Sequence, residues 1–258
     1  MQLSHAELAR DAALWFVAFV CLHFICRWLS AVCSTTFSTL SAPDKAYWAA
    51  SAVSTANALI VASVAINAFC FTEPGFFVLS NDLYRMQPHV PLWAGFFLGY
   101  LAADLLATIV HWKSWSGVEA NAVHHSLAIV AYWQIVTGGF GHFHALTGWL
   151  LESTTPLVNQ RWFFAKAGWD GTLIYKLNGL MVVLMWLVLR ILVYGWGLTQ
   201  RATFQVAELD TFRTVTIYTV FVGGWALQWM WGYKLFRGLL KALGIAGNTG
   251  TKPVRASE

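Results

Sequence analysis

The first features of this sequence that could do chemistry are ionisable side chains that interrupt long apolar runs. An ionisable group at the centre of a bilayer costs about 2.5–3.5 kcal/mol on the insertion scale, so it marks a functional site by default. Histidine can serve as a base or a nucleophile, and a carboxylate can pair with a buried cation. We therefore expect an interior polar site. The polar residues that coincide in three successive apolar segments are Asp104, His111, His124, His125, Glu152 and Asn159.

The spacing of these residues places several of them on common helix faces. The polar positions that share a face are Asp104, Thr108 and His111 in one segment, and Asn121, His125 and Tyr132 in the next. His124 lies about 100° from His125 around the helix. We therefore expect one of the two histidines to line the site and the other to pack between helices.

The run LLESTTPLVNQRW carries a further polar stripe, with Glu152, Thr155, Pro156 and Asn159 at i, i+3, i+4 and i+7. Proline has no N–H to donate to the carbonyl four residues earlier. The pattern predicts a kink at Pro156 and a free carbonyl on Glu152. Such a break at membrane depth is tolerated only against protein or a wet cavity.

The following apolar segment holds two strongly polar residues, Asn178 and Arg190. Arg190 is the partner we expect for Glu152 or Asp104, because a lone buried charge is costly. Structural roles are the alternative for each residue. An intramembrane Asn or Thr can simply join two helices, and the head of Arg190 can reach a nearby membrane surface.

The histidines and cysteines do not form a metal-binding pattern. Di-iron membrane enzymes need eight or more imidazoles in HxxxH and HxxHH boxes, whereas the chain has eight histidines in all and several are scattered. His142 and His144 lie in the glycine-rich run GGFGHFH, where we expect them to be solvated. The four cysteines include no CxxC pair and are interpreted as small apolar residues. The sequence predicts no metal and no bound cofactor.

The elements that must position these residues are membrane-spanning helices. The chain is 58% hydrophobic and 11% charged, well below the roughly 25% charged residues of a soluble domain. A spanning helix needs about 20 largely apolar residues. This predicts an all-α, polytopic membrane bundle of about seven helices. The expected spans are Ala12–Val32, Trp48–Phe71, Leu92–Val110, Asn121–Val136, Ala145–Phe164, Leu173–Trp196 and Val215–Phe236.

The distribution of Lys and Arg predicts how the bundle is oriented. With the N-terminus outside, ten basic residues fall on the cytoplasmic side and four on the opposite side, which fits the excess found in cytoplasmic loops. The ten are Lys45, Lys113, Arg161, Lys166, Lys176, Lys234, Arg237, Lys241, Lys252 and Arg255; the four are Arg10, Arg85, Arg201 and Arg213. We predict a cytosolic C-terminus.

The domain organisation follows from the same reading. We expect a short N-terminal segment (1–11), a single transmembrane domain (12–236) and a basic cytosolic tail (237–258), whose end from Asn248 onward is disordered. The net charge of +4 could suggest nucleic acid. Basic residues next to the last span more often face anionic lipid, so we expect no nucleic-acid partner.

The stretch from Gly99 to Arg190 resembles the TLC domain family, which includes the ceramide synthases. The resemblance rests on Asp104, the pair His124-His125, the run LLESTTPLVNQRWFFAKAGW and Asn178-Gly179 ahead of Arg190. It implies a ring of six helices around a central cavity, one further helix, and residence in the endoplasmic reticulum. In ceramide synthases the His-His pair serves acyl transfer from acyl-CoA to a sphingoid amine, which assigns that role to His124 and His125.

The resemblance to ceramide synthases is incomplete. Those enzymes carry an HD and a further Asp shortly before LLES, whereas this chain reads HALTGWLLES, with Thr147 and Gly148 there. Three hypotheses stay open. We favour a membrane-embedded lipid-binding protein of lipid homeostasis whose partner is a membrane lipid or fatty-acyl chain. The alternatives are a ceramide-synthase-like acyltransferase with acyl-CoA as co-substrate, and a transporter or channel.

Overall fold

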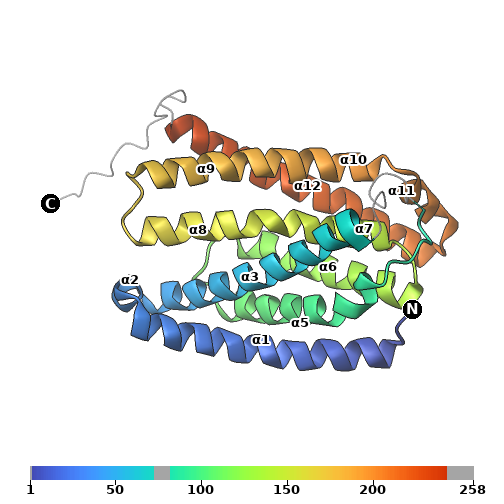
Figure 1. Cartoon of the computed structure of the whole chain (residues 1–258), viewed down its shortest axis with the longest axis horizontal. Coiled ribbons are helices and arrows are strands. Elements are labelled where there is room, and N and C mark those ends of the chain that lie inside the picture. The colour runs from blue at the N-terminus through green and yellow to red at the C-terminus, as the bar shows by residue number, and fades with distance from the viewer. Residues whose placement is uncertain (1, 73–81, 243–258) are drawn as a thin grey trace.

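The computed structural model describes residues 2–72 and 82–242, and these residues form a bundle of long helices with no strand among them (Figure 1). Seven helical segments make up the bundle. They are α1 (His5–Cys33); α3 with η1 (Ala42–Asn67, Ala68–Thr72); α5 (His89–Val110); α6 (Val118–Gly138); α7, η2 and α8 (His142–Leu151, Glu152–Thr154, Thr155–Lys166); α9, η3 and α10 (Leu173–Met185, Trp186–Val193, Tyr194–Leu198); and α12 (Thr211–Ala242). Short helices occupy two connections: α2 (Thr35–Thr39), and α11 with η4 (Arg201–Gln205, Val206–Glu208).

The seven segments coincide with the seven predicted spans, and the predicted all-α membrane bundle is confirmed. Most of the helices extend beyond the predicted limits. A capping box explains the early start of α1, because Ser4 accepts a hydrogen bond from the Glu7 amide and Glu7 accepts one from the Ser4 amide. The predicted disordered end of the tail lies outside the described residues.

Four of the segments are both long enough and apolar enough to cross a membrane: His5–Cys33, Ala42–Thr72, His89–Val110 and Leu173–Leu198. The other three, α6, α7–α8 and α12, contain 21 or more residues, which is within the range that spans a bilayer. These three do not reach the same apolar standard as the four. The site therefore draws on both kinds of helix, with His124, His125 and Glu152 on the less apolar segments and Asp104 and Arg190 on the more apolar ones.

Six of the segments form a closed ring. In order around it, α3 packs on α5, α5 on α6, α6 on α12, α12 on α9 and η3, α9 on α8, and α8 with α7 on α3. The remaining helix, α1, lies outside the ring against α5 and α3, at one edge of the bundle (Figure 1). The predicted arrangement of six helices plus one is confirmed.

Close contact between α1 and α5 depends on glycine. A Cβ added to Gly99 would lie 2.6 Å from the backbone nitrogen of Phe16 and 2.6 Å from the Cβ of Trp15. Next to this contact, the ring of Phe19 packs edge-on against Phe96, with centroids 5.0 Å apart. Glycine therefore lets the two helix backbones approach each other, as small residues do in membrane helix pairs.

One end of the ring is closed by the segment before α5. The Leu83 carbonyl accepts a hydrogen bond from the Gly141 amide (2.6 Å), and the Leu83 amide donates to Gln205 Oε1 (3.0 Å). The Gln87 amide donates to His142 Nδ1 (2.7 Å), and His142 is 1% exposed. The expectation that His142 is solvated is therefore wrong, because the chain that precedes α5 folds over it.

We predict that Gly99→Ala lowers the melting temperature of the purified protein, because the added methyl group meets backbone that cannot move away without separating α1 from α5. Overpacking of this kind costs about 1–3 kcal/mol. Gly238→Ala on α12 is the matched control, since its Cβ would meet nothing within 4 Å. The control should melt at or slightly above the wild-type temperature. Equal melting temperatures for the two variants would contradict the proposed close contact.

Candidate functional site

The ring encloses a cavity with two adjoining halves. The apolar half has a volume of about 120 Å³ and is lined by residues of α5, α6, α7, α10 and α12. The polar half has a volume of about 480 Å³ and is lined by residues of α3, α5, α6, α8 and α12. Ligand sites commonly measure about 300–1,000 Å³. Five residues line both halves, and we call them the junction: Tyr100, His124, His125, Glu152 and Arg190.

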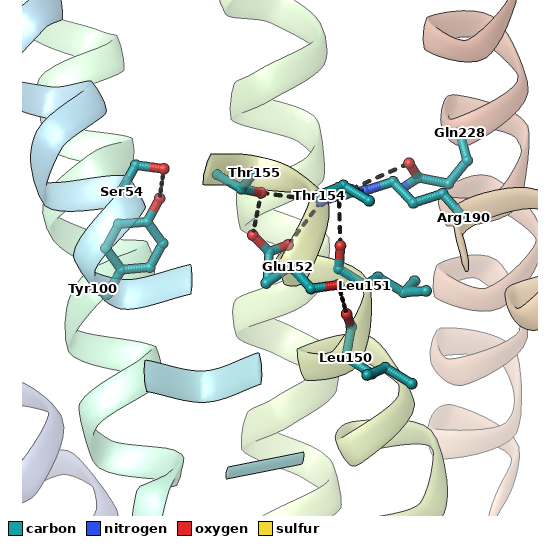
Figure 2. Close-up of polar contacts among 10 residues, drawn as sticks. Ser54, Tyr100, Leu150, Leu151, Glu152, Thr154, Thr155, Arg190 and Gln228 are labelled. Atoms are coloured by element: carbon teal, nitrogen blue, oxygen red, sulfur yellow. Dashed lines mark hydrogen bonds and ion pairs between the residues drawn. The ribbon is translucent and has the colours of Figure 1, made fainter. Parts of the chain in front are cut away.

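Arg190 is the most heavily bonded side chain of the junction (Figure 2). Its Nη2 lies 3.3 Å from Glu152 Oε1, so the predicted ion pair is present. Arg190 Nε donates to Thr154 Oγ1 (2.7 Å), and Nη1 donates to Gln228 Oε1 on α12 (3.3 Å). Arg190 is only 5% exposed. Its charge is therefore compensated inside the ring, and the alternative that it reaches a membrane surface is wrong.

Two irregular helical turns bring the members of this cluster together. Arg190 lies in the π-helix η3, a turn type often found at functional sites. Glu152 begins the 3₁₀ turn η2, and Pro156 stands in the first turn of α8, where its missing N–H is tolerated. The α-helix is interrupted at Glu152–Thr154, directly before Pro156 rather than at it. The predicted free carbonyl is wrong, because the Thr155 amide donates to the Glu152 carbonyl in the tighter turn.

The two histidines face different walls of the same cavity. His125 Nδ1 lies 3.2 Å from Asp104 Oδ2 on α5. His124 faces α12 instead, with its ring edge-on to Trp231 at 5.4 Å. Both line the two halves, so the expectation that one of them packs between helices is wrong. The cavity spans a wide arc of α6, and two side chains 100° apart both fit within that arc.

Asp104 is held in place by its neighbour on α6. Asn121 Nδ2 donates to Asp104 Oδ2 (3.3 Å) and to Thr108 Oγ1 (2.9 Å). The carboxylate therefore joins α5 to Asn121 of α6 and lies close to His125, whose buried Nδ1 makes no hydrogen bond within the described residues. An imidazole beside a carboxylate can take up or release a proton.

The other predicted residues divide between the cavity wall and helix contacts. Asn159 and Thr155 line the polar half, and Tyr132 lines the apolar half. His111 ends α5 and stacks on Trp115, with centroids 4.6 Å apart, and Asn178 donates to the Leu157 carbonyl of α8 (3.2 Å). The structure does not place His111, Asn178 or Pro156 on the lining of either half.

The lining also includes residues that the sequence analysis did not single out. Ser51 and Ser54 of α3, one turn apart, face the polar half, while Tyr100 belongs to the junction. His144 lines the apolar half, where its ring stacks on that of Phe221 with centroids 4.5 Å apart. The expectation that His144 is solvated is therefore wrong. The spacing of Tyr47, Ser51 and Ser54, at i, i+4 and i+7, was a signal in the sequence. Tyr100 gave none, because it lies in the apolar run GFFLGYL.

The acids and histidines of the cavity do not form a metal-binding group. Across the described ranges, no three His, Cys, Asp or Glu side chains come together as metal ligands would. What the cavity offers is the Arg190–Glu152 ion pair on one side and, on another, the His125 imidazole close to the Asp104 carboxylate. This arrangement can bind polar groups and move a proton.

We predict that Glu152→Gln and Arg190→Gln each destabilise the protein, because each leaves the partner charge buried and alone. Breaking a buried pair costs about 3 kcal/mol or more. The double variant should be more stable than the sum of the two losses implies. Thermal unfolding of the four proteins in one detergent measures this coupling. Strictly additive losses would show that the two charges are independent.

Comparison with known proteins supports the architecture. The TLC domain profile matches residues 47–237. The human protein named TLC domain-containing protein 4 is 26% identical over 262 residues, covering 94% of this chain and 93% of the relative. TLC domain-containing protein 4-B of Danio rerio is 29% identical, covering 76% and 75%. Protein CLN8 of Canis lupus familiaris is 28% identical, covering 69% and 62%.

No solved structure matches the chain. The profile match covers well over half of the 258 residues and includes all six helices of the ring. The chain therefore belongs to the TLC domain family, whose members are membrane proteins of lipid metabolism and homeostasis.

Proposed function

We propose that this protein binds a membrane lipid in the two-part cavity and acts in lipid homeostasis. The observation that carries the proposal is the contrast between the adjoining halves inside one ring of helices. The apolar half is walled by side chains such as Phe97, Leu101 and Phe221, whereas the polar half contains Asp104, Asn121 and Asn159. An amphiphile has the same division into chain and head.

The closed end of the ring supports one direction of binding. The apolar half includes Phe143, His144 and Leu198, which come from the same end as the segment that folds over His142. The polar half reaches Trp115, Gly117 and Lys234 at the opposite end. An acyl chain would therefore lie toward the closed end, with its head group toward Lys234.

The basic residues support a cytosolic position for the end of the bundle opposite the closed one, which is the end that Lys234 faces. The connections after α1, α5 and α8 lie at the same end of the bundle as the C-terminal end of α12 (Figure 1). These connections and the helix turns beside them carry Lys45, Lys113, Lys166 and Lys176, the excess expected of cytoplasmic loops. We propose that the C-terminus is cytosolic and that the protein resides in the endoplasmic reticulum.

Acyl transfer of the ceramide-synthase type is the second candidate, favoured by the His125–Asp104 pair. In that reaction an amine attacks the thioester carbonyl of acyl-CoA, a C–N bond replaces the C–S bond, and the amine proton passes to the departing thiolate. His125, whose Nδ1 lies 3.2 Å from Asp104 Oδ2, would carry that proton. The positions of Thr147 and Gly148 supply no acid, so Asp104 and Glu152 would be the cavity's carboxylates.

We predict that filling the apolar half removes a bound lipid without unfolding the protein. Gly197→Leu adds a side chain where a Cβ would meet only Thr147 Cγ2, at 4.0 Å. Native mass spectrometry of the wild-type protein should show a lipid adduct that this variant lacks. Gly238→Leu, on an open surface of α12, is the matched control and should keep the adduct. If the filled variant also keeps it, the lipid lies elsewhere.

The acyl-transfer candidate predicts ceramide formation when the purified protein receives acyl-CoA and a sphingoid base. His125→Ala and Asp104→Asn should each reduce the rate, with a loss of about 100-fold or more for the base itself. Ser126→Ala on the outer face of α6 should leave the rate unchanged. Ceramide production at background level by a wild-type protein that binds lipid would rule out this reaction and leave the binding function in place.

A further inference from the structure

We propose that Ser54, supported by Tyr100, is the donor that binds the acyl carbonyl of the lipid. This inference rests on the proposed lipid binding and extends it, because it identifies the chemical group recognised at the junction. The lipid class is then an amphiphile with a carbonyl between its chain and its head group, such as an acyl ester or amide.

The argument begins with the protons of two hydroxyl groups. Tyr100 is 5% exposed, and its hydroxyl donates to Ser54 Oγ at 3.1 Å (Figure 2). A serine hydroxyl has one proton of its own and can donate it while it accepts another bond. Within residues 2–72 and 82–242, Ser54 donates no hydrogen bond. Its proton is therefore available to a ligand in the polar half, which Ser54 lines.

Several neighbouring donors are already committed to partners in the protein. Arg190 donates to Glu152, Thr154, Thr155 and Gln228. The amide of Asn121 serves Asp104 and Thr108, and the amide of Asn159 serves the Ser51 carbonyl and Thr55 Oγ1. Thr155 donates to Glu152 Oε2 (2.8 Å). A ligand oxygen would have to displace these bonds, whereas the Ser54 proton is available without such a loss.

The position of the pair matches the point where a chain meets its head group. Tyr100 lines both halves, and its ring lies 6.2 Å from that of His125. In Figure 2, Ser54 and Tyr100 stand on α3 and α5, apart from Glu152 and Arg190, and the polar half lies between Ser54 and Glu152. A chain that fills the apolar half would bring its first carbonyl to this level.

The charges around the junction favour a neutral oxygen as the bound group. Asp104 and Glu152 both line the polar half, and the Arg190 charge is already matched by Glu152. An anionic oxygen at this level would meet two carboxylates and no free guanidinium. A carbonyl oxygen brings a dipole without a charge, and a hydroxyl donor polarised by the Tyr100 bond binds it well.

The test uses two lipids that differ only at that carbonyl. Purified protein in detergent is mixed with equal amounts of palmitoyl lysophosphatidylcholine and its ether analogue, in which CH₂ replaces the carbonyl. Native mass spectrometry reads the ratio of the two adducts in one spectrum, so the shared head group cancels. Wild type should prefer the ester by about three- to tenfold, the range of a single hydrogen bond.

Ser54→Ala should reduce this preference to about onefold while binding of the ether lipid stays unchanged. Tyr100→Phe should weaken the preference in the same direction. Two matched variants should keep it: Ser126→Ala, on the outer face of α6, and Tyr218→Phe, which lines neither half and whose hydroxyl already donates to the Thr203 carbonyl (3.0 Å). Thermal unfolding of each variant verifies that it is folded.

The outcomes separate this inference from the function on which it rests. Equal binding of ester and ether by wild type, or an ester preference that survives Ser54→Ala in a folded protein, would overturn the assignment of Ser54 and leave lipid binding intact. Binding of neither lipid by wild type, together with no co-purified lipid adduct, would overturn both.

Discussion

The buried charge of Arg190 is the constraint on which the rest of the interior depends. A guanidinium at membrane depth must be matched by an anion and by hydrogen-bond acceptors. Here the match requires four elements at once: Glu152 and Thr154 from the η2 turn, Thr155 from α8, Gln228 from α12, and the π-helix that presents Arg190 itself. Trp186 of the same π-helix supports this cluster in two ways. Its ring centre lies 4.7 Å from the Arg190 guanidinium, and its indole N–H donates a hydrogen bond to the Gln228 backbone carbonyl (3.0 Å). Satisfying one charge therefore fixes how three walls of the ring meet.

The hydrogen bonds of Arg190 also shape the cavity, because they fix the positions of the helices that line it at the depth of the junction. The helices carry polar groups where the cluster forms and apolar groups beyond it, so the interior divides into two halves at the junction. Asp104 and His125 lie close together on the other side of the space, with Asp104 Oδ2 3.2 Å from His125 Nδ1. With its charges matched internally, the junction presents few unsatisfied groups to a ligand. Those that remain, such as the Ser54 hydroxyl, are neutral.

Helix positions could be predicted from the sequence because a run of about 20 apolar residues has few alternatives to a membrane span. The pairing of Glu152 with Arg190 was also predictable, since each is costly without the other. The prediction of a free Glu152 carbonyl is wrong because the 3₁₀ turn supplies the Thr155 amide as donor, one residue earlier than an α-helix would. A proline in the sequence predicts an interruption of the α-helix but does not determine which type of turn replaces it. The two histidines were assigned to separate surfaces because helix angle alone cannot show how wide an arc the cavity covers. Tyr100 and His144 could not be found by polarity, because their partners Ser54 and Thr203 lie far away in the chain.

Binding and catalysis make different demands on this junction, and the geometry separates them. The proposed binding would need room for an apolar chain and a donor for the polar part of the lipid, and the cavity offers an apolar half and the Ser54 hydroxyl without any movement of the Arg190–Glu152 pair. Acyl transfer needs in addition a base whose lone pair reaches the reacting amine, and a path for its proton. The base of that proposed reaction would be His125, beside Asp104. His124 stands next to it, with the two imidazole centroids 5.5 Å apart, and packs edge-on against Trp231 of α12. Asp104 accepts a hydrogen bond from Asn121 and lies beside His125, whereas the Arg190 cluster is built from other residues. The groups that the proposed acyl transfer would use therefore lie on one wall of the cavity, while the Arg190–Glu152 cluster lies on another.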